Sequence, residues 1–406
     1  MNQLLKNKVF WIMLSSDMLD QISIWIRNMA VLFYIIEKTN QDPVAISLIT
    51  VIEYAPIFLF SFIGGTFADR WNPKKTIISG GLLSIVSILI ILGFISFGMW
   101  EAVFFATFVS AIVSQFSQPS SAKIFKRHIP ENQVGSAIGI VQSLGSLFLI
   151  LGPIIGTAVY SNFGISVSLS LLILTFGLST VITLFLPKDA KKEKQADSTI
   201  VTEIKQGFHY VLHNHNLKRI ALIFCFLGLG AGLVQPLEVF LITDRLQLPK
   251  EALQWLSAAA GAGLLIGGII AATLVNRLHV RVTFVGTFLL LALSTVIEVL
   301  STSFILTASM RFITAFMMAF MQILLSTMMI KLVEEKFIGR TNGIITPIFI
   351  LFLLIGTASS GPLLKITSLF TVFSLSAITV ALAAIPALGM SVAPHTENKE
   401  ERIKTL

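Results

Sequence analysis

The chain has 406 residues, of which 55% are hydrophobic and 12% charged, and its mean hydropathy is +0.86. Soluble domains carry about 25% charged residues, so this composition excludes an ordinary soluble enzyme or binding domain. The formal net charge of +8 raises the question of an anionic partner, such as nucleic acid or a membrane surface. The single cysteine, Cys225, lies in an apolar run and excludes an intrachain disulfide.

Twelve apolar stretches, each long enough to cross a bilayer, fill most of the chain, and each predicts a transmembrane helix. In chain order they cover residues 10–36, 44–67, 76–96, 102–124, 134–158, 164–186, 218–242, 253–275, 282–302, 304–330, 340–364 and 368–390. The basic start of the chain has no small-residue cleavage site before the second stretch. We therefore expect a first transmembrane helix there rather than a removed signal peptide.

The basic residues predict the orientation of these spans. If the N-terminus is cytoplasmic, the inner segments hold 23 of the 29 Lys and Arg, the outer loops hold 4, and Arg27 and Arg311 lie inside spans. Cytoplasmic loops of membrane proteins are enriched in Lys and Arg, so we expect both termini in the cytoplasm and a bacterial inner or plasma membrane. Because the basic residues are spread over seven inner segments, they account for the net charge without a nucleic-acid partner.

A polar linker divides the twelve spans into two sets of six. Its first part is charged, and its second part is amphipathic, with apolar residues at helical spacing from Ile200 to Val211. We expect this second part to form a surface helix on the inner leaflet. The predicted organisation is an N-terminal six-helix bundle (1–186), a linker (187–217), a C-terminal six-helix bundle (218–390) and a cytoplasmic tail (391–406).

Three short patterns recur in the two halves at offsets of 204 to 209 residues and at equivalent spans. The matched pairs are Asp69-Arg70 with Asn276-Arg277, Gly152-Pro153 with Gly361-Pro362, and Glu131, Gly135 and Gly139 with Glu335, Gly339 and Gly343. Their common order suggests a duplicated six-helix unit. Paired repeats in transporters place the substrate site near the midplane between the halves.

The loop after the second span carries a glycine, an acid and three basic residues: Gly65, Asp69, Arg70, Lys74 and Lys75. A glycine lets a neighbouring helix approach, the acid can meet a helix N-terminus, and the basic residues hold the loop at the inner face. This spacing resembles the loop 2–3 signature of the major facilitator superfamily, with Asn72 where that family usually has glycine. The alternative is a plain positively charged inner loop.

The fifth span carries Gly145, Gly152, Pro153 and Gly156. This pattern resembles the superfamily's antiporter motif, which implies proton-coupled export rather than uptake. We expect Pro153 to kink the helix and the glycines to pack closely against a helix of the other half. The alternative is ordinary helix packing, because Gly and Pro are common in transmembrane helices.

Three further stretches resemble the macrolide-efflux branch of the superfamily, which also includes the enterobactin exporter. They are the loop from Pro119 to Ala137, the end of the first span from Asn28 to Tyr34, and the loop from Glu335 to Arg340. The resemblance covers the whole chain. It implies an all-α integral membrane protein in which twelve transmembrane helices form two six-helix bundles, and a drug:proton antiporter without cofactors.

The first two spans hold four charged residues, which are costly in hydrocarbon: Asp17, Asp20, Arg27 and Glu53. Spacings of 3 and 7 put the first three on one face of a helix. We expect Arg27 to pair with one acid while another stays protonated part of the time, as suits a proton carrier. The alternative is a static ion pair. Gln115 in the fourth span is a further candidate for the cavity wall or a bridge between helices.

Other polar residues give weaker signals. Glu298 and Arg311 lie in the outer parts of adjacent spans and predict a structural pair, while Glu238 can reach water at the interface. The histidines of the linker lack a nearby cysteine, so no metal site is expected. The sequence carries no phosphate-binding glycine loop, Walker lysine or nucleophile elbow, so it predicts neither an ATP-driven pump nor an enzyme.

The leading hypothesis is a secondary active transporter that exports an amphipathic small molecule, drug-like or macrolide-like, in exchange for protons by alternating access. Its cavity is expected between residues 1–186 and 218–390. Its partners would be the substrate, protons and the lipid bilayer, with no metal and no nucleic acid, and we expect a monomer. The alternatives are an exporter of a siderophore or lipid-like metabolite, and a non-transporting receptor or assembly factor on the same fold.

Overall fold

The computed structural model describes the backbone of residues 4–187, 200–274, 279–333 and 335–390. Within these ranges, the side chains of residues 61–70, 200–204, 206, 330–332, 335, 336 and 338–340 lie outside the description. The charged part of the predicted linker and the predicted tail therefore fall outside the described residues.

The N-terminal half contains five long helices and one short one. They are α1 (Lys8–Lys38), α2 (Pro43–Arg70), α3 (Pro73–Ser96), the 3-10 helix η1 (Trp100–Val103), α4 (Phe104–His128) and α5 (Glu131–Leu184). Asparagines begin two of them. The Asn7 side chain accepts hydrogen bonds from the first turn of α1, and Asn72 does the same for α3, where Pro73 occupies the first helical position.

The C-terminal half begins after the surface helix α6 (Ile200–His213). Its elements are α7 (His215–Val234), η2 (Gln235–Leu237), α8 (Glu238–Phe240), η3 (Leu241–Arg245), η4 (Lys250–Ala252), α9 (Leu253–Leu274), α10 (Val280–Leu300), α11 (Phe304–Leu332), α12 (Glu335–Ile366), α13 (Leu369–Leu382) and α14 (Ala384–Leu388). The helix η3 is a π-helix, whereas η2 and η4 are 3-10 helices.

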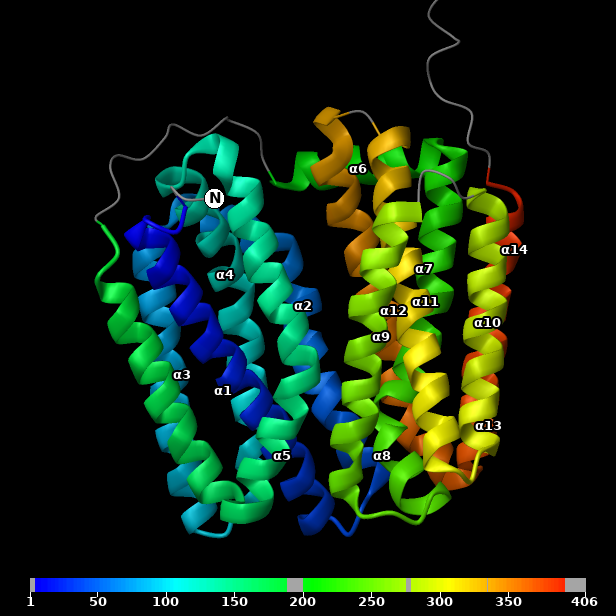
Figure 1. The fold of residues 1–406 in the computed structure, drawn as a ribbon, viewed down its shortest axis with the longest axis horizontal. Coiled ribbons are helices and arrows are strands. Elements are labelled where there is room, and N and C mark those ends of the chain that lie inside the picture. Colours follow the sequence, from blue (N-terminus) through cyan, green and yellow to red (C-terminus); the bar gives the residue numbers. More distant parts are fainter. Residues whose placement is uncertain (1–3, 188–199, 275–278, 334, 391–406) are drawn as a thin grey trace, which may run out of the picture.

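Eleven helical segments of the described chain are long and apolar enough to cross a membrane, and one of them, α5, contains two crossings. Its 54 residues would extend about 80 Å if straight, more than twice the hydrocarbon thickness of about 30 Å. Gly164 lies outside the helical conformation at φ 70°, and the chain reverses direction there (Figure 1). The predicted all-α fold with twelve transmembrane helices is confirmed.

The helices form two upright bundles that stand side by side (Figure 1). The first bundle contains α1–α5 and the second contains α7–α14, while α6 lies across one end of the second bundle. We call this end of the molecule the α6 end, and the opposite end, where α8 lies, the α8 end. The start of α1 and the last described residues both lie at the α6 end.

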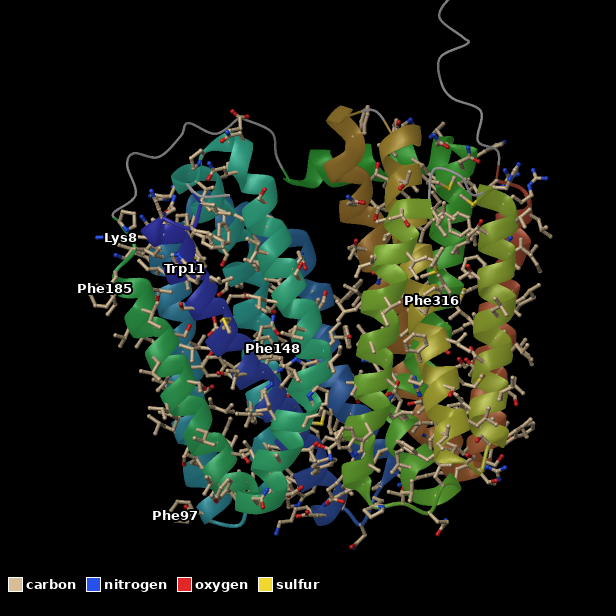
Figure 2. All side chains as sticks on the ribbon, viewed as in Figure 1. Lys8, Trp11, Phe97, Phe148, Phe185 and Phe316 are labelled. Carbon is tan, nitrogen blue, oxygen red and sulfur yellow. The ribbon has the colours of Figure 1, made fainter. Side chains whose placement is uncertain are left out.

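Large apolar side chains cover the outside of both bundles (Figure 2). Phe97 is 85% exposed at the α8 end, and Phe185 is 75% exposed on the outer side of the first bundle. Apolar exposure on this scale is unusual for a protein in water and is what a lipid-facing surface requires. Trp11 adds an amphipathic ring near the α6 end, where its indole N–H donates to the carbonyl of Leu5 at 2.7 Å.

The two halves share their core only toward the α8 end of the described structure. One buried apolar cluster there combines Ala30, Phe33 and Ile35 of α1 with Leu237 and Phe240 of the C-terminal half. Further from that end, each half has clusters of its own. One is built around Phe10, Ile124 and Phe125 in the N-terminal half, and another around Phe284, Phe288 and Leu324 in the C-terminal half.

Polar contacts join the halves at the same end. Lys250, at the start of η4, pairs with Glu37 at the end of α1, and Lys365 lies 2.9 Å from Asp42. The hydroxyl groups of Ser47 in α2 and Ser360 in α12 lie 2.9 Å apart. The α8 end of this conformation is therefore closed by apolar packing, two ion pairs and a buried hydrogen bond.

Candidate functional site

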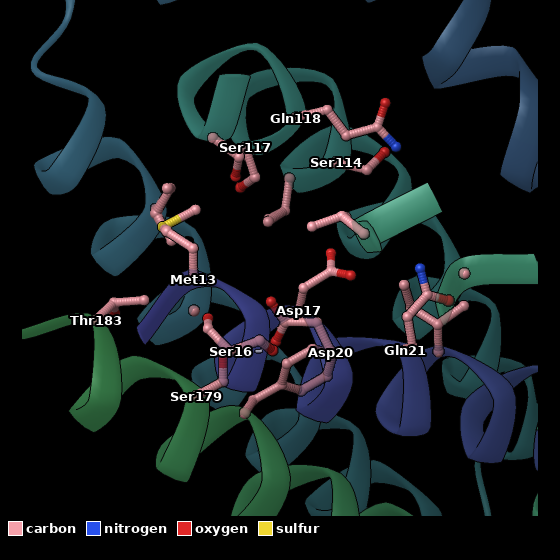
Figure 3. A pocket seen from close by; sticks show the side chains of 18 of the residues that line it. Met13, Ser16, Asp17, Asp20, Gln21, Ser114, Ser117, Gln118, Ser179 and Thr183 are labelled. Carbon is pink, nitrogen blue, oxygen red and sulfur yellow. Dashed lines mark hydrogen bonds between the residues drawn. The ribbon is translucent and has the colours of Figure 1, made fainter. Parts of the chain in front are cut away.

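A cavity of about 460 Å³ lies inside the N-terminal bundle, among α1, α3, α4 and both limbs of α5 (Figure 3). Most of the side chains around it are polar. They are Ser16, Asp17, Asp20, Gln21, Ser84, Ser110, Ser114, Ser117, Gln118, Ser121, Gln142, Ser179, Thr180 and Thr183. Among the described residues that line the cavity, two are acidic and none is basic. The cavity wall thus offers hydroxyl and amide groups around a site of negative charge.

Asp17 and Asp20 come from one face of α1, because residues three apart are neighbours on a helix. Figure 3 shows the Asp17 carboxylate directed into the cavity and Asp20 close to Ser16 and Ser179. Asp20 lies within hydrogen-bonding reach of Ser179, whose hydroxyl is 2.8 Å from that of Ser16. One acid is therefore held by the wall, and the other is open to a ligand.

The helix α4 contributes a polar stripe that was not among the residues predicted from the sequence. Ser110, Ser114, Ser117, Gln118 and Ser121 all line the cavity. Their spacings of 4, 3 and 4, with Gln118 adjacent, are those of a single helix face, so a search for hydroxyl periodicity within the spans could have found them. Gln115, the predicted residue of this span, is not among the cavity-lining residues, and its amide lies 3.5 Å from the Ser114 hydroxyl.

Arg27 and Glu53 lie apart from this cavity. Their side chains approach to 4.0 Å, and the Arg27 side chain is 5% exposed against 31% for Glu53. The guanidinium also donates to Asn28 at 3.2 and 2.8 Å, and its Nη1 has no hydrogen-bond partner among the described residues. The acids of the first two spans are thus divided between a cavity without a basic residue in its described wall and a separate ion pair, although their positions in adjacent spans predicted a single cluster.

The glycines of the fifth span pack within their own half. A side-chain carbon at Gly152 would overlap the ring of Trp25 in α1, and one at Gly156 would meet the Trp25 carbonyl oxygen at 2.5 Å. The expectation that these glycines pack against the other half is therefore wrong. Gly145 has open space around it and lines the cavity.

A glycine of the C-terminal half makes a close contact between the halves instead. A side-chain carbon at Gly261 in α9 would lie 2.9 Å from the Leu149 carbonyl oxygen and 2.8 Å from Ile150 of α5. The fifth span does reach the other half, but through residues that the motif does not include.

Three residues of the predicted loop 2–3 motif are among those whose side chains the structure does not describe: Gly65, Asp69 and Arg70. Lys74 is described, and its ammonium group donates to the Leu184 carbonyl at 2.7 Å. A lysine there satisfies a carbonyl that the end of α5 leaves without an intrahelical partner. Lys75 is exposed at the start of α3.

Two bundles of membrane-crossing helices with a polar cavity inside one of them define a multi-pass membrane protein. The same fold occurs in the nucleoside transporter NupG, which matches with a TM-score of 0.75, 13% identity and coverage of 96% of this chain and 100% of that one. It also occurs in the peptide transporter POT in complex with sulfate, with a TM-score of 0.73, 13% identity and coverage of 94% of both chains.

The chain belongs to the major facilitator superfamily, whose sequence profile matches residues 13–243 and 220–405. It is a secondary transporter and not an enzyme. Among its relatives is YkuC of Bacillus subtilis (strain 168), an uncharacterised transporter of this superfamily. It is 25% identical over 367 residues, which cover 86% of this chain and 83% of YkuC. Another is macrolide efflux protein A of Streptococcus pyogenes, 24% identical over 253 residues that cover 60% of this chain and 61% of that protein.

Proposed function

We propose that this transporter exports a small amphipathic cation in exchange for protons. Asp17 and Asp20 would bind the cation and the protons alternately. The observation that carries this proposal is the cavity that these two acids line without any basic residue among its described lining side chains. The relation to macrolide efflux protein A supports export of a drug-like compound, and the antiporter-like pattern from Gly145 to Gly156 supports the same direction.

The physical basis of the exchange is the cost of charge in a poorly hydrated site. Two carboxylates within one membrane-embedded cavity repel each other, and no guanidinium or ammonium group of the described wall balances them. The cavity is neutralised either by protons or by a positively charged ligand. A ligand that enters therefore displaces protons, and protons that enter displace the ligand, which is the condition for antiport.

The proposed orientation rests on the distribution of basic residues. The sequence assigns 23 of the 29 Lys and Arg to the inner segments, so the positive-inside rule favours a cytoplasmic α6 end. The residues that line the cavity belong to the parts of α1, α3 and α4 toward the α6 end. Met13 of α1, Ile77 of α3 and Phe125 of α4 are among them. In this orientation the cavity would receive its substrate from the cytoplasmic side while the α8 end is closed.

The cavity dimensions limit the substrate. A volume of about 460 Å³ is within the range of about 300–1,000 Å³ that is typical of small-molecule sites. The hydroxyl groups of α4 can accept or donate hydrogen bonds, and Ile24, Val113 and Phe176 supply apolar surface. This combination suits a compact amine with both polar and apolar parts.

The test uses the purified transporter in lipid vesicles that contain a pH dye. A panel of cationic and neutral drug-like compounds would be supplied, and export would be driven by an imposed pH gradient. In Asp20→Asn and Asp17→Asn, we expect proton-driven transport to fall at least about 10-fold, because loss of one essential charge interaction costs more than about 1.4 kcal/mol. Glu101→Gln, an exposed acid in η1, is the matched control and should transport like the wild type.

Several outcomes would contradict this proposal. Proton-driven transport that is unchanged in both single variants and in the double variant would remove the coupling role of the cavity. If Arg27→Ala alone abolishes transport while the cavity variants remain active, the Arg27–Glu53 pair would carry the coupling instead. If no compound of the panel moves and neutralising the acids changes no cellular phenotype, a receptor or assembly factor would be the better account.

A further inference from the structure

A second group of charges, two of them buried and one partly exposed, lies in the C-terminal half, toward the α8 end. Arg311 of α11 lies between two acids that come from different elements. Its Nη1 is 2.8 Å from the Oε1 of Glu238 in α8, and its Nη2 is 3.2 Å from the Oε2 of Glu298 in α10. The side chains are 10% exposed for Arg311, 2% for Glu298 and 29% for Glu238. We call these three residues the Arg311 triad.

The triad does not balance its charges. Two carboxylates against one guanidinium leave a net charge of −1 if all three groups are ionised. A net charge in a membrane-embedded core is costly, and binding of one proton removes it. The Oε1 of Glu298 and the Nε of Arg311 have no hydrogen-bond partner among the described residues. A proton on one of the carboxyl groups would leave the guanidinium with one ionised partner, as in the Arg27–Glu53 pair.

The described cations on neighbouring elements have partners of their own: Lys250 of η4 pairs with Glu37, and Lys365 of α12 pairs with Asp42. In η3, the Asp244 carboxylate accepts a hydrogen bond from Thr243 at 2.9 Å, and Arg245 donates to the carbonyls of Leu300 and Ser301. The described residues of α9 and α13 include no Asp, Glu, Lys, Arg or His. Thr314 is the polar neighbour of Glu298 on α11.

The triad sits where the seventh span is broken. The regular helix α7 ends at Val234 and is followed by a 3-10 turn, by the three-residue helix α8 that carries Glu238, and by the π-helix η3. Short 3-10 and π segments are frequent at functional sites, and transporters build coupling-ion sites from interrupted helices. A break on both sides of Glu238 lets this acid move relative to α10 and α11 without unfolding a long helix.

The same broken segment contacts the N-terminal half. Gln235 of η2 hydrogen-bonds with Tyr54 of α2, the residue next to Glu53. Leu237 and Val239, on either side of Glu238, belong to the apolar cluster that both halves share at the α8 end. Separation of the halves at that end would therefore disturb the segment that carries Glu238.

We propose that the Arg311 triad is a second proton-exchange site, in which Glu298, the more buried of its two acids, holds one proton while the α8 end is closed. When the halves separate at that end, the broken segment of the seventh span moves Glu238 relative to Arg311, and the proton exchanges with the outside. Exchange of this proton during transport rests on the proposed antiport. The presence of the proton does not, because it can be detected in the protein without substrate. With the cavity acids near the α6 end, the transporter would then carry acidic sites in both halves.

The first measurement detects the proton without any substrate. Infrared difference spectroscopy of the reconstituted protein, recorded as the pH is changed, should show a protonated-carboxyl band at neutral pH. We expect loss of the triad's contribution to that band in Glu298→Gln and in Glu238→Gln. It should remain in Asp17→Asn/Asp20→Asn, which removes the cavity acids, and in the control Glu101→Gln. A band that neither single triad variant alters would overturn the proposal.

Thermal melts distinguish a triad that holds one proton from a triad in which both acids are ionised. If one acid is already neutral, each single Glu→Gln variant should melt like the wild type, while Glu238→Gln/Glu298→Gln should melt at a lower temperature because Arg311 loses its last ionised partner. If each single variant is as unstable as the double variant, both acids are ionised in the native state, and the proposal is wrong.

A third measurement connects the site to transport. Once a substrate is known, the number of protons exchanged per substrate should fall by one in Glu298→Gln, with substrate still moving. Failure of the antiport proposal would leave the infrared band unaffected, so the two proposals fail independently. An unchanged proton count in a folded Glu298→Gln variant would contradict the triad's role in exchange.

Discussion

The two ends of the molecule are held together in different ways. At the α8 end, side chains of both halves share one apolar cluster, and Lys250 and Lys365 form ion pairs across the boundary. Toward the α6 end, the described buried clusters each belong to one half. In the proposed alternating-access cycle, interactions across the boundary break and reform, so the α8 end is the one that we expect to open next.

This difference also separates the two acidic sites. The cavity with Asp17 and Asp20 belongs to the α6-end part of the N-terminal bundle, whereas the Arg311 triad is covered by the shared packing at the α8 end. In our proposal, opening of the α8 end controls access to the Arg311 triad and not to the cavity. The following variants test which contacts hold that end closed.

The largest effect is expected from Gly361→Leu. A side-chain carbon at Gly361 of α12 would lie 2.5 Å from the backbone oxygen of Pro43 and 2.7 Å from the Ser47 hydroxyl of α2. A leucine must therefore push the halves apart, at a cost typical of overpacking, about 1–3 kcal/mol, that the closed state alone bears. We expect a large shift toward conformations that are open at the α8 end.

Spin-label distance distributions measure this shift. Labels at Phe97 and Ile305, which are exposed by 85% and 77%, would report on the α8 end in a Cys225→Ser background. The matched control is Gly343→Leu, because Gly343 lies on the same helix with open space around it. Identical distributions in Gly361→Leu and the control would show that this contact does not hold the halves together.

Lys250→Ala should have the next largest effect. Besides its ion pair with Glu37, the Lys250 ammonium group lies 5.4 Å from the ring centre of Phe33 and 5.7 Å from that of Tyr160. The side chain is 17% exposed, so loss of these contacts should shift the closed–open equilibrium by about 1–2 kcal/mol. The same labels at the α8 end would report this change.

The control for that variant is Lys38→Ala. Lys38 lies 5.6 Å from the ring centre of Tyr34, a residue of its own half and helix. Its removal should leave the distance distribution unchanged. Equal shifts in the two lysine variants would mean that charge near the α8 end matters, and not the contact between the halves.

The Lys365–Asp42 pair should contribute less and should depend on pH. Its side chains are 47% and 35% exposed, and exposed pairs are worth about 0–1 kcal/mol. Burial alone would raise the pKa of Asp42, but the hydrogen bond from Lys365 and those from the backbone N–H groups of Val44 and Ala45 hold that pKa below its usual range. The pair therefore stabilises the closed end above the usual aspartate pKa of about 3.9, and this contribution is lost as the pH falls through the lowered value.

The test is a pH series of distance distributions in the wild type and in Asp42→Asn. At neutral pH, the variant should differ slightly from the wild type, and the difference should vanish at the acidic end of the series. Persistence of the full difference at low pH would exclude titration of Asp42 as its cause.

The smallest effect on the boundary is expected from Gly152→Leu. Because Gly152 packs on Trp25 of its own half, a leucine should destabilise the N-terminal bundle by about 1–3 kcal/mol. It should leave the distance between the halves unchanged. A lower melting temperature with an unaltered label distribution would support this expectation, and a shift comparable to that of Gly361→Leu would contradict it.

Gly152 and Gly361 show that the local sequence does not determine which helix a glycine contacts. Gly152-Pro153 and Gly361-Pro362 look equivalent in the two repeats, yet Gly152 contacts α1 within its half and Gly361 contacts α2 across the boundary. The contact partner of a glycine depends on how its helix is rotated and which neighbour faces it. Neither property is encoded in the local pattern.

The number of spans and the helix that follows the charged part of the linker could be predicted from the residues alone. These properties depend on hydropathy and helical periodicity, which are local. The packed structure was needed to find that Asp17 and Asp20 line a cavity within one bundle, that Arg27 faces Glu53, and that Arg311 holds two acids. Each of these arrangements brings together residues from different helices, and the packing of whole helices fixes which side chains meet.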